Sequence, residues 1–506
     1  MSNRKKSLKN LIFSVLSQLI TIGLGLIIPR LWIVSYGSEV NGLLSSLSQF
    51  LVYLGLFEAG VGAATMQALY QPIAKKDWDK VSGVLSATGT YYKKTGTWYL
   101  IGLVILAVLY PVFVDTSLSF ATVFGAVFFS GIGNVVTFYF QGKYNYLLQA
   151  DGKSYLFSIL STIIHILTSL TKILLIPLKV NIVVILAIGV AFQGIQLLFI
   201  LWYVKRNYPH ICLTVPPDTG ALAQKNSALL HQISSLIFRN TDVLILTVFC
   251  DLRIVSVYSM FKMITSNIET LIRIPFLSVS FALGQTYQTD KQRFIQRIDL
   301  MESYFSAMVY ALFSVTLFLF LPFMRLYTAG VTDVNYIDPY LAWLFVICSL
   351  MDKSRTPMLS TIEYAGHYRQ TLPRSIVEAC INLTVSVLGV YFLGIYGVLL
   401  GTVAALGYRT NDIILYSNHK LLDRSAKKTY AIYLVDVVLF LLLQYIFRWL
   451  FGGVEISSYL IFAMVGVGCA VISFVLLIGG QTLVFPHCRA FAGSICRQML
   501  RKIKKS

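Results

Sequence analysis

The chain has 506 residues, of which 57% are hydrophobic and only 12% are charged, and its mean hydropathy is +0.72. No soluble domain buries so much apolar surface, so the composition excludes a soluble protein and predicts a polytopic membrane protein. The formal net charge of +19 would suggest nucleic acid as the partner of a soluble protein. The distribution of the basic residues along this chain argues against nucleic acid as a partner.

Apolar stretches long enough to cross a hydrocarbon core of about 30 Å recur along the whole chain. They predict an all-α protein with about fourteen transmembrane helices and no second folded domain. The first stretch follows basic residues as a signal sequence does, but it is too long for one, and we expect a retained helix. The predicted spans are residues 11–34, 40–70, 97–114, 118–140, 156–178, 181–204, 228–250, 254–283, 303–327, 337–360, 374–394, 396–418, 429–450 and 457–485.

Most of the 41 Lys and Arg residues lie in the N-terminal tail, in alternate loops and in the C-terminal tail. The positive-inside rule therefore predicts that both termini are cytoplasmic. This placement accounts for the basic balance without nucleic acid. The basic segments 75–96 and 485–506 are partly amphipathic, and we expect them to lie on the anionic inner leaflet.

Sliding the sequence against itself by 214 residues superimposes the first six spans on the next six. Gly152 then falls on Gly366. A constant offset predicts two equivalent six-helix bundles related by parallel pseudo-symmetry, with a cleft between them suited to alternating access. The alternative is that two hydrophobic segments fall into rough register by chance. The predicted organisation is one bundle over residues 1–210, a second over 211–425, two added helices over 426–485 and a basic tail over 486–506.

Three charges interrupt the apolar stretch at 254–283. Lys262, Glu269 and Arg273 are separated by offsets of seven and eleven, so all three lie on one helical stripe. One such charge at the bilayer centre costs roughly 2.5–3.5 kcal/mol even on a lenient insertion scale. These side chains must therefore face one another or water.

A structural alternative is ion pairing within each helix. The candidate pairs are Glu269–Arg273, Arg239–Asp242 and Arg409–Asp412. The third lies near a cytoplasmic end, away from the predicted cleft, and there we favour the structural interpretation. In the other two spans we favour a cleft, in which pairing leaves Lys262, together with Arg30 after Pro29, as surplus positive charge. A cationic cleft suits an anionic cargo.

Other polar residues in the spans are interpreted as structural. Glu58 does not share a face with Gln49, and its neighbours Gly60 and Gly62 favour close helix packing. His165 and Lys172 are alternatives for a proton relay, but burial by a neighbouring helix is the simpler interpretation.

Sequence motifs indicate neither a cofactor nor a metal. Gly152-Lys153-Ser154 resembles the end of a P-loop, but Leu147 stands where that motif needs glycine. The seven cysteines show no C-x-x-C pair, so neither a disulfide framework nor a metal site is indicated. A membrane-embedded polymerase or ligase remains an alternative, although the chain lacks the sizeable outside loop that would hold an acceptor.

Fourteen spans as six plus six plus two resemble the multidrug/oligosaccharidyl-lipid/polysaccharide (MOP) exporter superfamily. Within it, IIPRLWIVSYGSEVNGLLSSLSQFLVYLGLFEAGVGAATMQALY at 27–70 is similar to the polysaccharide transporters that act as repeat-unit flippases (Wzx-like). The matching features are the short glycine-containing turn and the long second helix ending in Glu58-x-Gly60-x-Gly62. YRTNDIILYSNHKLLDRSAKKTY at 408–430 resembles the end of the second repeat in such proteins.

The resemblance implies a MATE- and MurJ-like, V-shaped pair of bundles around a cationic cavity. The cavity residues would be Arg30, Arg239, Lys262 and Arg273. The implied cargo is an oligosaccharide on undecaprenyl diphosphate, moved from the inner to the outer leaflet of the bacterial cytoplasmic membrane. The implied partners are membrane lipid, a polysaccharide polymerase and other assembly proteins, and no covalent step is catalysed.

Two relatives within the superfamily remain alternatives: flippases of lipid-linked peptidoglycan precursors, and cation-coupled drug exporters. Drug exporters take cationic cargo, so the basic residues count against them. Asp242 or Glu269 are candidates for sodium or proton coupling, with Glu58 a further candidate for coupling or charge pairing.

Overall fold

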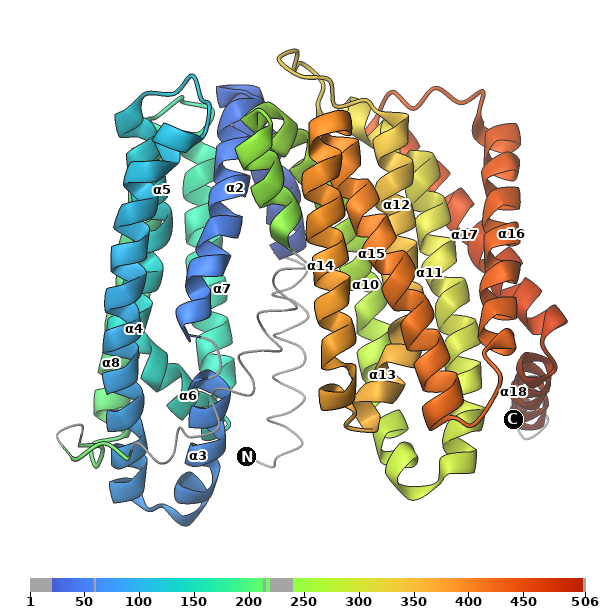
Figure 1. Cartoon of the computed structure of the whole chain (residues 1–506), viewed down its shortest axis with the longest axis horizontal. Coiled ribbons are helices and arrows are strands. Elements are labelled where there is room, and N and C mark those ends of the chain that lie inside the picture. Colours follow the sequence, from blue (N-terminus) through green and yellow to red (C-terminus); the bar gives the residue numbers. More distant parts are fainter. Residues whose placement is uncertain (1–20, 59–60, 213–214, 219–239, 504–506) are drawn as a thin grey trace. The chain divides into compact units, whose positions relative to one another are not determined.

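The computed structural model describes residues 21–58, 61–212, 215–218 and 240–503, and in this part of the chain the regular structure is helical (Figure 1). The helices of the first half are Thr21–Tyr36, α2 (Ser38–Leu54), α3 (Val61–Lys75), α4 (Trp78–Phe113), α5 (Phe120–Val136), α6 (Gly142–Ala150), α7 (Ser154–Leu175), α8 (Ile182–Asn207) and Asn240–Phe249. Those that follow are α10 (Leu252–Thr289), α11 (Lys291–Tyr327), α12 (Pro339–Ser354), α13 (Thr356–Tyr364), α14 (Tyr368–Leu393), α15 (Ile395–Tyr416), α16 (Lys427–Phe451), α17 (Tyr459–Val484) and α18 (Pro486–Ile503).

Each of the fourteen predicted spans coincides, in whole or in part, with a described helix. Among the described residues, eight helical stretches are long and apolar enough to cross a membrane. The predicted all-α, polytopic membrane class is therefore confirmed.

α17 shows why these sequences form membrane helices. Its buried side chains recur every four residues and form one face. They are Val465, Cys469, Ser473, Leu477 and Gln481. The opposite face exposes large apolar side chains, which suit lipid contact. They include Leu460, Met464, Val467, Val471 and Val475.

The second predicted span is not one continuous helix. α2 ends at Leu54, a single 3-10 turn follows at Gly55–Glu58, and α3 begins at Val61. Residues 59–60 lie outside the described part of the chain, so the predicted role of Gly60 is untested. At Gly62 the packing is close, because an added Cβ would lie 2.1 Å from the Tyr146 hydroxyl oxygen.

The chain divides into two compact units. The first comprises residues 1–259 with 331–334, and the second comprises 260–330 with 335–506. The division falls inside α10. The reason is that the residues around 240–256 pack on α2 in the first unit.

Hydrogen bonds between polar side chains fasten α2 to these residues. Asn41 Nδ2 donates to Ser256 Oγ at 2.8 Å, and at Gly42 an added Cβ would lie 1.8 Å from the Leu252 carbonyl oxygen. Further along α2, Thr247 Oγ1 donates to Ser46 Oγ at 2.8 Å. The small and polar residues of this segment therefore serve close helix packing.

Two turns located 214 residues apart have the same geometry. Gly152 and Gly366 both have φ of +69°. The amide of Gly152 donates to the Gln149 carbonyl at 3.1 Å, and that of Gly366 donates to the Glu363 carbonyl at 3.0 Å. These local structures agree with the predicted offset, whereas the domain boundaries drawn from it remain a prediction.

Candidate functional site

Lys262, Glu269 and Arg273 lie on α10, which is one uninterrupted helix despite Pro275. At 100° per residue, their spacings bring them to within about 20° of one stripe. The sequence analysis therefore placed the three charges correctly on one helix face.

The predicted pairing of Glu269 with Arg273 is wrong. Glu269 instead forms an ion pair with Lys353 Nζ at 3.0 Å and accepts a hydrogen bond from Ser349 Oγ at 3.1 Å. Both partners belong to α12, which packs near α10 in the second unit. A tertiary contact has replaced the local i, i+4 pair, which is worth only about 0.2–0.5 kcal/mol in an isolated helix.

This pairing changes which cation of α10 is available. Arg273 is exposed, and it makes no ion pair with the described residues. Lys262 is half-buried and has contacts of its own. Arg273 is therefore a better candidate than Lys262 for binding an anion, which reverses the order that the sequence predicted.

The predicted residues of the first unit have different environments. Arg30 is half-buried near the end of the helix Thr21–Tyr36. Asp242 is buried and accepts a hydrogen bond from the Tyr258 hydroxyl at 2.7 Å. Arg239 lies outside the described residues, so its pairing with Asp242 and its cavity role remain predictions.

Glu58 is held by two tyrosine hydroxyl groups. Tyr92 donates a short hydrogen bond to its Oε1, and Tyr146 donates to the same oxygen at 3.1 Å. The two tyrosine rings stack with centroids 6.4 Å apart. These contacts support the structural interpretation of Glu58 at the break in the second span.

The second unit contains a continuous chain of alternating acidic and basic side chains. The predicted ion pair between Arg409 and Asp412 is confirmed, and it forms one end of this chain. The members in order of contact are Glu269, Lys353, Asp352, Arg355, Glu378, Arg409, Asp412 and Arg374. The four acids balance the four bases, which makes the chain a structural network rather than a cationic surface.

The sequence carries one signal of this network that is not among the predictions above. Asp352, Lys353 and Arg355 lie together inside the predicted span 337–360. Three charges in four residues of an apolar span indicate partners on neighbouring helices. The sequence does not show which residues these partners are, because they lie on α10 and α14, far away along the chain.

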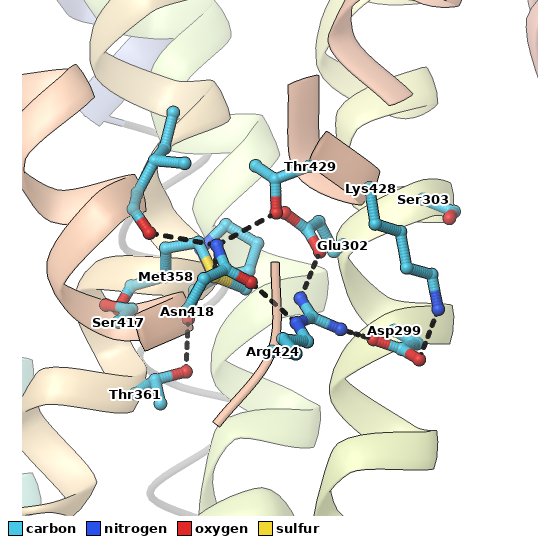
Figure 2. Close-up of polar contacts among 12 residues, drawn as sticks. Asp299, Glu302, Ser303, Met358, Thr361, Ser417, Asn418, Arg424, Lys428 and Thr429 are labelled. Atoms are coloured by element: carbon cyan, nitrogen blue, oxygen red, sulfur yellow. Dashed lines mark hydrogen bonds and ion pairs between the residues drawn. The ribbon is translucent and has the colours of Figure 1, made fainter. Parts of the chain in front are cut away.

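A second charged cluster joins α11 to the residues around the start of α16 (Figure 2). Arg424 forms ion pairs with Asp299 and, at 3.0 Å, with Glu302, and Lys428 also pairs with Asp299. Arg424 Nε also donates to Asn418 Oδ1 at 2.6 Å. The cluster anchors the segment that leads into the added helices α16 and α17, and its cations are all engaged by acids.

The first unit contains a cavity of about 390 Å³ lined by the helix Thr21–Tyr36, α2, α5, α7 and α8. We call it the N-cavity. Its polar lining residues are Asn41, Ser45, Ser48, Ser130, Thr168, Lys172 and Gln193. Lys172 is the single ionisable side chain among the described lining residues, so the cavity is cationic. The prediction for Lys172 was burial by a neighbouring helix, and no cavity was predicted here.

The fold and these charges define an all-helical, multi-pass membrane protein with cations and a polar cavity inside its helical units. The sequence matches no protein-family model and no curated protein. Comparison with solved structures, however, does find similar folds.

The chain is similar to a structure described as lipid II flippase MurJ in an inward closed conformation, with a TM-score of 0.66 and 14% identity over 92% of this chain and 98% of that one. It is also similar to an inward-facing multidrug resistance MATE family transporter of the MOP superfamily, with a TM-score of 0.62 and 17% identity over 81% and 95% of the two chains. A MATE structure in a bent conformation gives a TM-score of 0.51 and 16% identity over 83% and 95%. The predicted MATE- and MurJ-like fold is therefore confirmed.

Proposed function

We propose that the chain is a flippase for oligosaccharide repeat units linked to undecaprenyl diphosphate. It would move them from the inner to the outer leaflet of the bacterial cytoplasmic membrane for surface polysaccharide synthesis, with both termini cytoplasmic. The named structural neighbours are a flippase and transporters, which supports transport rather than a covalent reaction.

Arg273 is the observation that carries this proposal. An arginine in a membrane helix costs roughly 2.5–3.5 kcal/mol if it meets only lipid. Its guanidinium group presents donors that match phosphate oxygens, and hydrogen bonds between charged groups are the stronger ones. Because Lys353 already neutralises Glu269, the positive charge of Arg273 is available for a diphosphate.

Alternating access through a wet cleft would let the head group cross while the prenyl chain remains in lipid. The protein then lowers the desolvation barrier of the head group and makes no covalent change. Arg30, Arg239 and Lys262 are proposed to contribute further positive charge to this path.

The second candidate is a flippase of lipid-linked peptidoglycan precursors. It is favoured by the similarity to the structure described as a lipid II flippase, which covers nearly the whole chain. A drug exporter for cationic cargo agrees less well with the positive charge of Arg273 and the N-cavity.

The test uses inverted membrane vesicles and the rate at which an undecaprenyl-diphosphate oligosaccharide reaches the other leaflet. Because one charged hydrogen bond is lost, the transfer rate of Arg273→Ala should be at most about one tenth of the wild-type rate. Arg273→Lys should retain part of the wild-type transfer rate. The matched control is Arg293→Ala, since Arg293 is exposed at the start of α11. An Arg273→Ala variant that inserts normally and flips at the wild-type rate would contradict the proposal.

The same vesicles separate the two candidates, because lipid II can replace the oligosaccharide lipid as cargo. Faster transfer of lipid II by the wild-type protein would favour the second candidate. Coupling through Asp242 or Glu269 predicts faster transfer when a sodium or proton gradient is imposed. Rates that are independent of both gradients would exclude coupling.

A further inference from the structure

The N-cavity combines one cation with a lining that suits a sugar. Hydroxyl and amide side chains from α2, α5, α7 and α8 surround it, and Trp32 adds an aromatic wall. Its volume of about 390 Å³ lies within the range of small-molecule sites. Hydroxyl and amide groups are the partners that sugar hydroxyl groups need, whereas a prenyl chain would leave them unsatisfied.

Lys172 has no acidic partner among the described residues that line this cavity. It is half-buried on α7, and it makes no hydrogen bond or ion pair with the described residues. By contrast, Lys353, Arg355 and Arg424 each form an ion pair with an acidic side chain. An ammonium group in a polar cavity without a counter-charge is suited to binding an oxyanion.

α7 presents further polar groups on the same face as Lys172. Thr168 lies four residues before it and also lines the N-cavity, and His165 lies seven residues before it. On α8, Gly189 leaves room, because an added Cβ would meet only Thr168 Cγ2, at 3.4 Å. Gly189 and Thr168 therefore form the wall of the N-cavity where α7 and α8 face each other.

We propose that the N-cavity is a sugar subsite that binds an acidic sugar residue of the cargo, with its carboxylate or phosphate substituent on Lys172. The proposal rests on the proposed function and names a feature of its substrate: the repeat unit contains at least one acidic sugar. The site lies within the first unit and involves none of the cations of α10.

The test measures binding to the purified full-length protein in lipid nanodiscs. Two probes share the undecaprenyl diphosphate carrier, and one ends in glucose while the other ends in glucuronic acid. Loss of one charged hydrogen bond predicts about tenfold weaker binding of the glucuronic acid probe to Lys172→Met. Binding of the glucose probe should be unchanged, and Lys172→Arg should retain the preference for the acidic probe.

Lys179→Met is the matched control, because Lys179 is an exposed lysine just beyond the end of α7. A second variant, Gly189→Leu, fills the cavity without removing charge and should also weaken binding of the acidic probe. Thermal unfolding of each variant verifies that it is folded.

Equal weakening of both probes by Lys172→Met would mean that Lys172 binds the diphosphate, and this would overturn the sugar subsite. Unchanged binding of both probes by Lys172→Met and Gly189→Leu would also overturn it. If the wild-type protein binds neither probe, the proposed function fails and the subsite fails with it. That result differs from a failure of the subsite alone, in which the wild-type protein still binds both probes.

Discussion

His487, the second residue of α18, lies close to positive charge. Its Nε2 is 3.0 Å from Ser303 Oγ on α11. Burial, together with the charges of Lys428 and Arg424, lowers the pKa of the His487 imidazole from 6.5 to about 4. The neutral ring is therefore the form that fits where α18 docks on α11.

The pH dependence of this docking follows from the lowered pKa. Well above pH 6.5 the ring is neutral whether α18 is docked or free, and its contribution is complete. As pH falls from 6.5 toward 4, the free form takes up a proton that the docked form resists, so docking weakens. The readout is the modification rate of buried Cys488 in a variant where it is the sole cysteine.

His487→Gln is the control, since it has no titrating ring. Dividing the parent's modification rate by the rate for this control removes the intrinsic pH dependence of the thiol. The rate for the parent relative to this control should rise below pH 6.5. A constant ratio between pH 7.5 and 5 would contradict the assignment.

At the residue scale, sequence reasoning placed charges better than it paired them. It put Lys262, Glu269 and Arg273 on one face, because helical periodicity is a local property. It assigned Glu269 to the wrong partner, because Lys353 is distant in the sequence and only packing brings it near. For the same reason the sequence does not mark Lys172 as a site, since a lone lysine gives no sign of the cavity around it.

At the scale of elements, α14 and α15 illustrate how small residues set helix separation. An alanine Cβ at Gly397 would lie 2.1 Å from the carbonyl carbon and oxygen of Gly389. The two backbones are therefore in direct contact, which is the arrangement that glycines permit between membrane helices.

Gly397→Ala should push these helices apart and destabilise the protein by about 1–3 kcal/mol, the usual range for overpacking. The free energy of unfolding in mixed micelles, measured by titration with a denaturing detergent, checks this. Gly479→Ala in α17 is the control, because no atom lies within 4 Å of the added Cβ. Equal stability of the two variants would show that α14 and α15 are not so close.

The second span shows what sequence reasoning cannot resolve in an element. Residues 40–70 have uniform hydropathy, so they were predicted as one helix. The structure instead breaks the helix at Gly55–Glu58 and fixes the break with Tyr92 and Tyr146. These tyrosines come from other helices, and no local pattern reveals them.

At the scale of the whole molecule, the turns at Gly152 and Gly366 allow a test of the repeat. Both glycines have φ of +69°, and an added Cβ would meet no atom within 4 Å at either position. Alanine therefore introduces backbone strain alone, which costs about 1 kcal/mol. Gly152→Ala and Gly366→Ala should lower the free energy of unfolding by equal amounts, in the same micelle assay.

Gly479→Ala again serves as the unstrained reference. A loss at only one of the two turns would argue against equivalent positions in the two halves. Equal losses would support the predicted offset independently of any sequence alignment.

Much of the molecule's architecture was predictable because hydropathy and helix length are local properties of the sequence. The all-α class and the positions of the helices followed from them. The contacts of the residues around 240–256 with α2, such as that of Asn41 with Ser256, did not follow, because only tertiary packing brings these residues together.

The chain of alternating charges from Glu269 to Arg374 limits which substitutions the protein can accept during evolution. Each member contacts charges of opposite sign, so replacing one residue alone leaves a neighbour uncompensated in an apolar bundle. Replacements should therefore accumulate in pairs, and Arg355 with Glu378 should be lost together in related sequences. In a mutational survey, single substitutions here should lower the amount of protein in the membrane, so a loss of transport at these positions would reflect loss of the protein.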